Sequence, residues 1–164
     1  MINIILENII ENLNNDIDKC KESLYSKNLL EISISIEEMI DKYKGDKEDL
    51  IDLEKSNVWL YKKEDLESII NILENLKLNY INQYKANLMK EGFENFKSNL
   101  ESNKNILDIK KVEVLSLVTQ LENIINSSIE SEYKWEKMKK HIEYISNQEF
   151  PIGYELLKLI TLMF

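Results

Sequence analysis

The chain has 164 residues and a formal net charge of −9, with 30 carboxylates against 21 cationic side chains, all of them lysines. Without arginine there is no planar, bidentate guanidinium, on which catalytic phosphoryl chemistry and nucleic-acid readout usually depend. The acidic balance opposes direct binding of DNA or RNA, because phosphate contacts need concentrated positive charge. With one His, one Cys, three Gly and one Pro, most metal sites and phosphate-binding loops are excluded too.

Helical spacing runs through nearly the whole sequence. Apolar residues recur three and four positions apart, and glycine and proline are too scarce to turn many strands. We therefore predict an all-α protein, a helical bundle built around a long antiparallel α-hairpin. A chain of this length is expected to form a single domain, 1–164. Within it we place short helices in 1–60, the hairpin in 62–147 and a hydrophobic C-terminal helix in 151–164.

The amino-terminal third predicts two helices of moderate length. The first covers about 3–25, with Asn14-Asn15-Asp16 as a candidate break. The second covers about 28–43 and is expected to end at Gly45 in a left-handed conformation. Isoleucine and serine alternate over 32–36, which would also fit a strand, but helical spacing extends beyond this run on both sides.

A short helix is expected next. Asp46 is the predicted N-cap, and Asp49 adds a carboxylate to the first turn of a helix that ends near Lys55. The helical spacing is then lost over 56–60.

The centre of the sequence predicts the hairpin. Its first arm covers 62–102 with a heptad-like apolar spacing, and a helix of that length would span about 60 Å. Gly92 is the expected bend. After a polar connection at 102–105, the second arm is predicted over 107–147, and a connection this short implies antiparallel neighbours.

The carboxyl-terminal stretch is the most hydrophobic of the chain. A helix over about 152–163 follows Pro151, and its apolar side chains are expected to pack into the protein's own core or onto a partner. No run approaches the roughly 20 apolar residues of a membrane span. The first ten residues lack a basic region followed by a cleavable apolar segment, so we expect a cytoplasmic protein without a membrane partner.

Residues suited to catalysis or metal binding are few. His141 has methionine three positions before it, where a di-iron bundle has glutamate. Cys20 lies in a charged helical stretch and is expected to be an incidental, partly exposed thiol. The acidic side chains form neither a calcium loop nor a regular metal spacing. We therefore assign no catalytic residue, no metal ligand and no cofactor, and an enzyme using Cys20 and His141 is the least favoured hypothesis.

Aromatic residues suggest an interface. Trp and Tyr are enriched at binding hot spots, although these side chains would equally seal the hairpin against the short helices. If the hairpin turns near residue 104, Trp135 should lie level with Glu74. The candidate protein-interface residues are Trp59, Tyr61, Tyr133, Trp135, Leu159 and Phe164.

Composition and size favour a non-catalytic, acidic protein-binding module. Its expected partner is a basic protein, such as a nucleic-acid-handling enzyme. The chain would then be an inhibitor, immunity or accessory protein of a bacterial or phage conflict system. The alternative is a structural coiled-coil homodimer or a subunit of a larger assembly, in which the hairpin supplies the seam.

Overall fold

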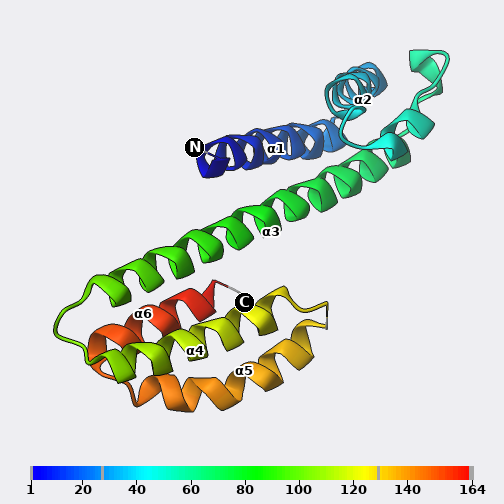
Figure 1. Cartoon of the computed structure of the whole chain (residues 1–164). Coiled ribbons are helices and arrows are strands. Elements are labelled where there is room, and N and C mark those ends of the chain that lie inside the picture. The colour runs from blue at the N-terminus through cyan, green and yellow to red at the C-terminus, as the bar shows by residue number, and fades with distance from the viewer. Residues whose placement is uncertain (1, 27, 129, 163–164) are drawn as a thin grey trace. The chain divides into compact units, whose positions relative to one another are not determined.

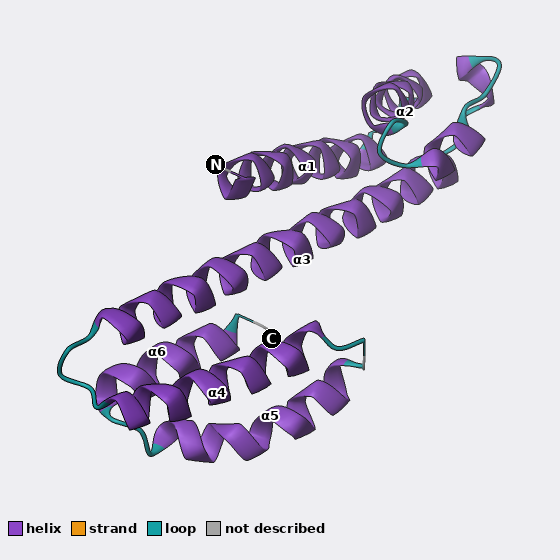
Figure 2. Cartoon of the chain, viewed as in Figure 1, coloured by secondary structure: helices purple, strands orange, loops and turns teal. Residues whose placement is uncertain are grey.

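The structure is a computed structural model that describes residues 2–26, 28–128 and 130–162 (Figure 1). Throughout this described part every regular element is a helix (Figure 2), so the predicted all-α class is confirmed. The elements are α1 (Ile2–Tyr25), α2 (Leu29–Tyr43), the 3-10 helices η1 (Glu48–Leu53) and η2 (Val58–Leu60), α3 (Lys63–Ser102), α4 (Asp108–Asn126), α5 (Ser131–Ser146) and α6 (Phe150–Thr161).

The chain forms two compact units, Met1–Tyr84 and Lys85–Phe164, and the boundary between them falls inside α3. This boundary differs from the predicted subdivision at about residue 60, because the first half of α3 packs in the amino-terminal core. That the whole chain forms one domain stays a prediction. Each unit is described by itself below.

The first unit packs α1, α2 and the first half of α3 around one apolar core. Antiparallel α1 and α3 are joined at the surface by an ion pair of 2.8 Å between Lys21 Nζ and Glu74 Oε1. In Figure 1, α2 is seen end-on and crosses α1. Asn28 caps α2, because its Oδ1 accepts a hydrogen bond of 3.1 Å from the backbone N–H of Leu30. Leu50 of η1 is fully buried and ties the 3-10 segment to this core.

A buried carboxylate lies between α1 and α2. Asp16 is only 4% exposed, and its Oδ2 accepts hydrogen bonds of 2.5 Å from both Tyr43 Oη and Lys42 Nζ. Since Asp16 is satisfied by tertiary partners, it does not compete with the helix backbone, and α1 is continuous through residues 14–16. The break expected at these residues is therefore wrong.

Two predicted helix ends differ from the structure. Gly45 does not have a positive φ, and the C-cap of α2 is Lys44, whose backbone N–H donates to the carbonyl of Ile40. The short helix after it is a 3-10 helix, η1, and its N-cap is Lys47 rather than Asp46. Asp46 thus lies one residue before the N-cap, and no side chain at the N-cap itself makes a capping bond.

The second unit is an up-down-up-down four-helix bundle made of the second half of α3 with α4, α5 and α6. Lys97 Nζ pairs with Glu122 Oε2 at 2.6 Å, and Lys111 Nζ donates to the carbonyl of Glu101 at 2.9 Å. From the first contact to the second, the residue number rises along α3 and falls along α4, so the two helices are antiparallel. Short connections then place α5 antiparallel to α4 and α6 antiparallel to α5.

The predicted second arm over 107–147 is wrong as a single helix. It divides into α4 and α5, which pack against each other. Helix α4 ends at Asn126. At its C-cap, Ser127, the backbone becomes extended and the hydroxyl donates a hydrogen bond of 2.6 Å to the carbonyl of Ile124. Ile129, which helical spacing assigns to the buried stripe of that arm, lies outside the described residues.

The first arm of the hairpin is confirmed as α3, within one residue of the predicted start. The buried face of α3 is not continuous, however. Residues 77–92, all of them described, include no buried side chain, and the buried positions fall into one group before this stretch and one after it. The two groups belong to different cores, so α3 supplies one side of each.

Candidate functional site

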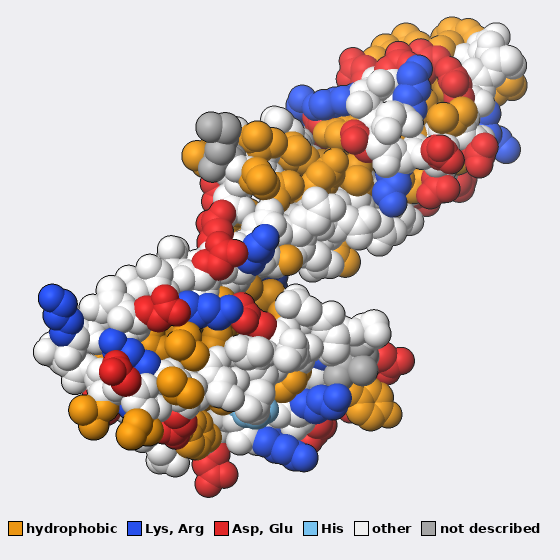
Figure 3. Space-filling view, viewed as in Figure 1, with side chains coloured by type: hydrophobic (Ala, Val, Ile, Leu, Met, Phe, Trp, Pro, Cys, Tyr) orange, Lys and Arg blue, Asp and Glu red, His pale blue; other side chains and the backbone are white. Residues whose placement is uncertain are grey.

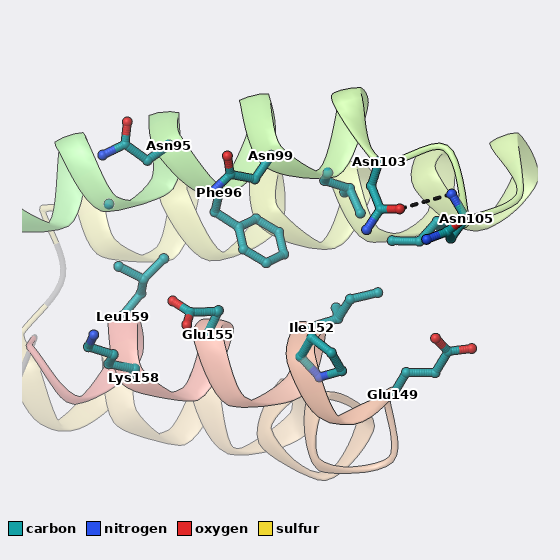
Figure 4. Close-up of a pocket in the computed structure, with 14 residues that line it drawn as sticks. Asn95, Phe96, Asn99, Asn103, Asn105, Glu149, Ile152, Glu155, Lys158 and Leu159 are labelled. Atoms are coloured by element: carbon teal, nitrogen blue, oxygen red, sulfur yellow. Dashed lines mark hydrogen bonds between the residues drawn. The ribbon is translucent and has the colours of Figure 1, made fainter.

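A groove of about 530 Å³ lies in the second unit between the last turns of α3 and helix α6. Figure 4 shows α3 along one side and α6 along the other, with side chains from both pointing into the space between them. Ile106, in the connection after α3, and Pro151, in the first turn of α6, line it as well. Its volume is within the range of about 300–1,000 Å³ that is usual for ligand pockets.

The α3 side of the groove carries an asparagine row, Asn95, Asn99 and Asn103. Asn95 and Asn99 lie four positions apart on one face of α3, a step of about 6 Å, and Asn103 follows four positions later, one residue beyond the last helical residue. All three are exposed. Asn103 Oδ1 accepts a hydrogen bond of 2.9 Å from the backbone N–H of Asn105, whereas the side chains of Asn95 and Asn99 have no partner within the described residues.

The α6 side carries three charged side chains. Glu149, Glu155 and Lys158 are exposed, and none of them forms an ion pair with another described residue. Figure 4 places Lys158 at the same end as Asn95, Glu149 at the opposite end near Asn105, and Glu155 between them. The groove thus has a cationic end and a longer anionic part.

The floor of the groove is apolar and already well packed. Phe96, Leu100, Ile152 and Leu159 line it, and each is at most 9% exposed because it also belongs to the core of the bundle. These four side chains themselves offer little surface to a ligand, but the half-buried Ile106 and the exposed Pro151 add apolar surface. The hydrogen-bonding and charged groups of the groove are the amides and charges of its rim.

Two glycines bring the helices close together around this site. A Cβ atom on Gly92 would lie 2.2 Å from Cδ2 of Leu159, so the absence of a side chain lets α6 approach α3 at the end of the groove. A Cβ on Gly153 would lie 2.7 Å from the carbonyl oxygen of Ile145, where α6 meets the end of α5. At both positions space and not conformation limits the residue, since neither glycine has a positive φ. The neighbouring atom belongs to a side chain at Gly92 and to the backbone at Gly153.

The candidate interface residues from the sequence do not form one site. Trp59 is 70% exposed in the first unit, whereas Tyr61 is buried and its hydroxyl accepts a hydrogen bond of 3.1 Å from the backbone N–H of Lys55. In the second unit Tyr133 is exposed, and Leu159 is buried beside the groove. Phe164 lies outside the described residues.

Trp135 is partly exposed on α5, and the Nζ of Lys139 lies 5.9 Å from the centroid of its ring. The predicted register with Glu74 required an unbroken second arm. Because α5 is a separate helix packed against α4 and α6, that register loses its basis.

Cys20 lacks the environment of a reactive thiol. It is fully buried, not partly exposed as expected, and burial, reinforced by the charges of Asp16 and Glu38, raises its pKa to about 11. A thiol with such a pKa stays protonated near neutral pH, and the thiolate is the nucleophilic form. His141 belongs to the other unit, where it is half-buried between α4 and α5 beside Glu113 and Tyr144. The described residues include no group of three or more His, Cys, Asp or Glu side chains placed to hold a metal ion.

Of the groove residues, only Leu159 was among the candidates predicted from the sequence; the polar ones, above all Asn99 and Glu155, were not. One signal is present there: four asparagines fall within 95–105, three of them at helical spacing. By itself the run predicts only a polar connection, because its neighbour across the groove, α6, is about sixty residues away in sequence.

Comparison with known protein families, with curated proteins and with solved structures finds no match to this chain. Among the described residues, no helix combines the length and the apolar character needed to cross a membrane. The groove is therefore interpreted from its own chemistry.

Proposed function

We propose that this chain is a non-catalytic, acidic protein-binding module that binds a basic partner through the groove between α3 and α6. The observation that carries the proposal is the set of unpaired polar groups at the groove. Glu149 and Glu155 have no cation, and Asn95 and Asn99 have no hydrogen-bond partner, within the described part of the chain. Convergent polar groups at a concave site of this volume are what a binding site supplies.

Both the net charge of the chain and the carboxylates of the groove favour a basic partner. The net charge of −9 attracts a cationic protein over a distance of about a Debye length, which raises the rate of association. On the face shown in Figure 3, however, lysines and carboxylates are interspersed. Selectivity would therefore come from the local carboxylates of the groove and not from one large acidic patch.

A homodimer is less well supported. A coiled-coil seam needs an apolar stripe free to pair with a second copy. On α3 the apolar residues from Leu66 to Leu76 and from Phe93 to Leu100 are instead used by the two cores. The hypothesis of an enzyme that uses Cys20 as its nucleophile is also less well supported, because this thiol is buried and its pKa is raised to about 11.

Among binding proteins, we favour an inhibitor, immunity or accessory role in a bacterial or phage conflict system. Nucleic-acid-handling enzymes present concentrated cationic surfaces to bind phosphate. An acidic module that covers such a surface would compete with the nucleic acid. This role rests on charge and on the groove alone.

The test is quantitative affinity purification from the native host with three forms of the full-length chain: wild type, Glu155→Lys and Glu143→Lys. Glu143 is an exposed residue of α5 outside the groove, so its substitution changes the net charge equally. We expect a basic protein that is recovered with the wild type and with Glu143→Lys, is lost with Glu155→Lys, and dissociates as salt rises. Equal recovery of every bound protein with both variants would contradict the proposal, as would a salt-resistant complex of the chain with itself alone.

A further inference from the structure

We infer that the groove binds an extended segment of a basic protein, with the main chain of the segment hydrogen-bonded to the asparagine row and its lysine or arginine side chains paired with Glu155 and Glu149. This inference rests on the proposed function and specifies the form in which the partner is recognised. It combines the periodicity of the row, the packing of the floor and the distribution of charge.

The spacing of the asparagine row fits an extended chain. Asn95 and Asn99 are separated by about 6 Å along α3, since the step is four residues at about 1.5 Å. Asn103 lies one residue past the helix and continues this spacing, because its backbone N–H still donates to the carbonyl of Asn99 at 3.1 Å. An extended polypeptide repeats every two residues, or about 6.4–6.8 Å. The mismatch is less than about 1 Å per step, which flexible side chains absorb over the two steps. Successive asparagines therefore meet alternate peptide groups that face the same way.

The chemistry of the amide side chain also fits. An asparagine offers a carbonyl acceptor and an NH₂ donor side by side, which complement the N–H and C=O of a peptide unit. Asn95 and Asn99 have both groups available, while the Oδ1 of Asn103 is already used by Asn105. We therefore expect the strongest main-chain contacts at Asn95 and Asn99 and a donor-only contact at Asn103.

The floor disfavours the other common way of binding a peptide. An amphipathic helix docks by placing apolar side chains into an apolar groove. Here Phe96 and Leu159 are only 9% and 8% exposed, so the floor along the groove offers little surface to successive apolar anchors. The more accessible apolar residues, Ile106 and Pro151, lie where α3 has ended and α6 begins, which is one end of the groove. An extended segment needs only shallow room for alternate side chains, and its main chain satisfies the polar rim.

Charge sets the composition of the segment. Glu155 lies in the middle of the groove and Glu149 at one end, so cationic side chains would occupy this part. Lys158 lies at the other end, across the groove from Asn95, and a cation would be repelled there. The bound segment should thus be basic over most of its length and neutral or acidic at the end next to Lys158.

The probe is an end-capped octapeptide in which lysine alternates with valine and threonine, titrated into the full-length protein at low salt and followed by NMR. Three proteins are compared: wild type, Asn99→Ala and Asn123→Ala, the last being an exposed asparagine of α4 outside the groove. A second octapeptide of the same sequence carries N-methyl groups on alternate amides, which removes main-chain donors without changing charge. Circular dichroism confirms that each variant is folded.

We expect saturable shifts of the side-chain NH₂ resonances of Asn95 and Asn99. Asn99→Ala should weaken binding about five- to thirtyfold, as the loss of two hydrogen bonds implies, and Asn123→Ala should leave it unchanged. N-methylation should weaken binding at least as much. Equal binding of the N-methylated peptide, equal effects of the two asparagine substitutions, or shifts confined to residues outside the groove would overturn the inference.

The two proposals fail differently. If the octapeptide does not bind at about millimolar concentration while the host partner still depends on Glu155, extended recognition is wrong and the groove remains the site of partner binding. If the host partner is also indifferent to Glu155→Lys, both proposals are wrong.

Discussion

Gly92 and Leu159 are in contact across the end of the groove, so closely that a Cβ atom on Gly92 would lie 2.2 Å from Cδ2 of Leu159. The contact places a turn of α3 directly against α6 and determines where the groove ends. A glycine in the interior of a long helix is normally unfavourable by about 1 kcal/mol relative to alanine. Here that cost is compensated by the close packing of two helices in the bundle.

Gly92→Ala tests this relationship. The added Cβ restores helix propensity, worth up to about 1 kcal/mol, but it forces the end of the Leu159 side chain into another rotamer at a similar cost. We expect the free energy of unfolding in urea to change by less than about 1 kcal/mol and the displaced Leu159 to weaken octapeptide binding.

The double variant Gly92→Ala/Leu159→Ala is the control. It should be more stable than the sum of the two single effects, because the clash is then removed. Additive effects would mean that the two residues do not compete for the same space.

Gly153→Ala should be more damaging. Its Cβ would lie 2.7 Å from the carbonyl oxygen of Ile145, and a backbone atom of a packed helix cannot rotate away. We expect a loss of about 1–3 kcal/mol in the free energy of unfolding. Gly45→Ala is the matched control, since a Cβ there would have no atom within 4 Å and the φ of Gly45 is not positive; it should be neutral or stabilising by about 0.4–1 kcal/mol. A stable Gly153→Ala protein would show that α5 and α6 can separate freely.

Asp16 should make the stability of the first unit sensitive to acid. Burial by itself raises the pKa of this carboxyl, but the hydrogen bonds from Lys42 and Tyr43 and the charges of Lys42 and Lys19 outweigh it and hold the pKa below its usual value. In the unfolded chain an aspartate has a pKa of about 4. A lower pKa in the folded state stabilises the protein at pH values above this, and the stabilisation is lost as pH falls through the folded pKa.

Asp16→Asn should therefore cost about 1–3 kcal/mol at pH 7 and show a smaller further loss of stability below about pH 4 than the wild type. Asp18→Asn, on an exposed position of the same helix, is the control and should have little effect. Thermal unfolding between pH 7 and 3 measures both. Parallel pH curves for the wild type and Asp16→Asn would contradict the assignment of acid sensitivity to this carboxylate.

Cys20 should be unreactive in the folded protein. Its burial excludes reagents, and a pKa of about 11 keeps the thiol protonated. We expect alkylation of Cys20 at pH 8 to be at least about a hundredfold slower in the folded protein than in urea, because the reagent reaches the thiol only after local opening. Rapid stoichiometric labelling of the folded protein would contradict this and would restore Cys20 as a nucleophile candidate.

Local patterns predicted much of the fold. The long helix α3 follows from sustained apolar spacing without an internal proline, and α2 begins where Asn28 supplies a side-chain cap. The division of the second arm was missed because apolar spacing continues across Ser127, and serine is only a mild helix breaker. The break predicted at Asp16 is absent because a buried partner such as Tyr43 satisfies the carboxylate, and such a partner cannot be inferred from adjacent residues.

The site was harder to predict than the fold. The asparagine row lies on one helix and its spacing is visible in the sequence, but a groove exists only where α6 packs beside it. That packing depends on Gly92 and Leu159, which are distant in sequence. The aromatic residues suggested an interface by type alone, and the structure distributes Trp59 and Trp135 between different units.

Photo-crosslinking in the native host tests the central claim most directly. A photoreactive phenylalanine derivative would replace Asn99 in the groove and, in a second protein, Asn123 outside it. If the groove binds the partner, irradiation should join a basic protein to the chain substituted at 99 and not to the chain substituted at 123. Crosslinks of equal yield from both positions, or a partner captured only from position 123, would contradict the claim that this groove is the binding site.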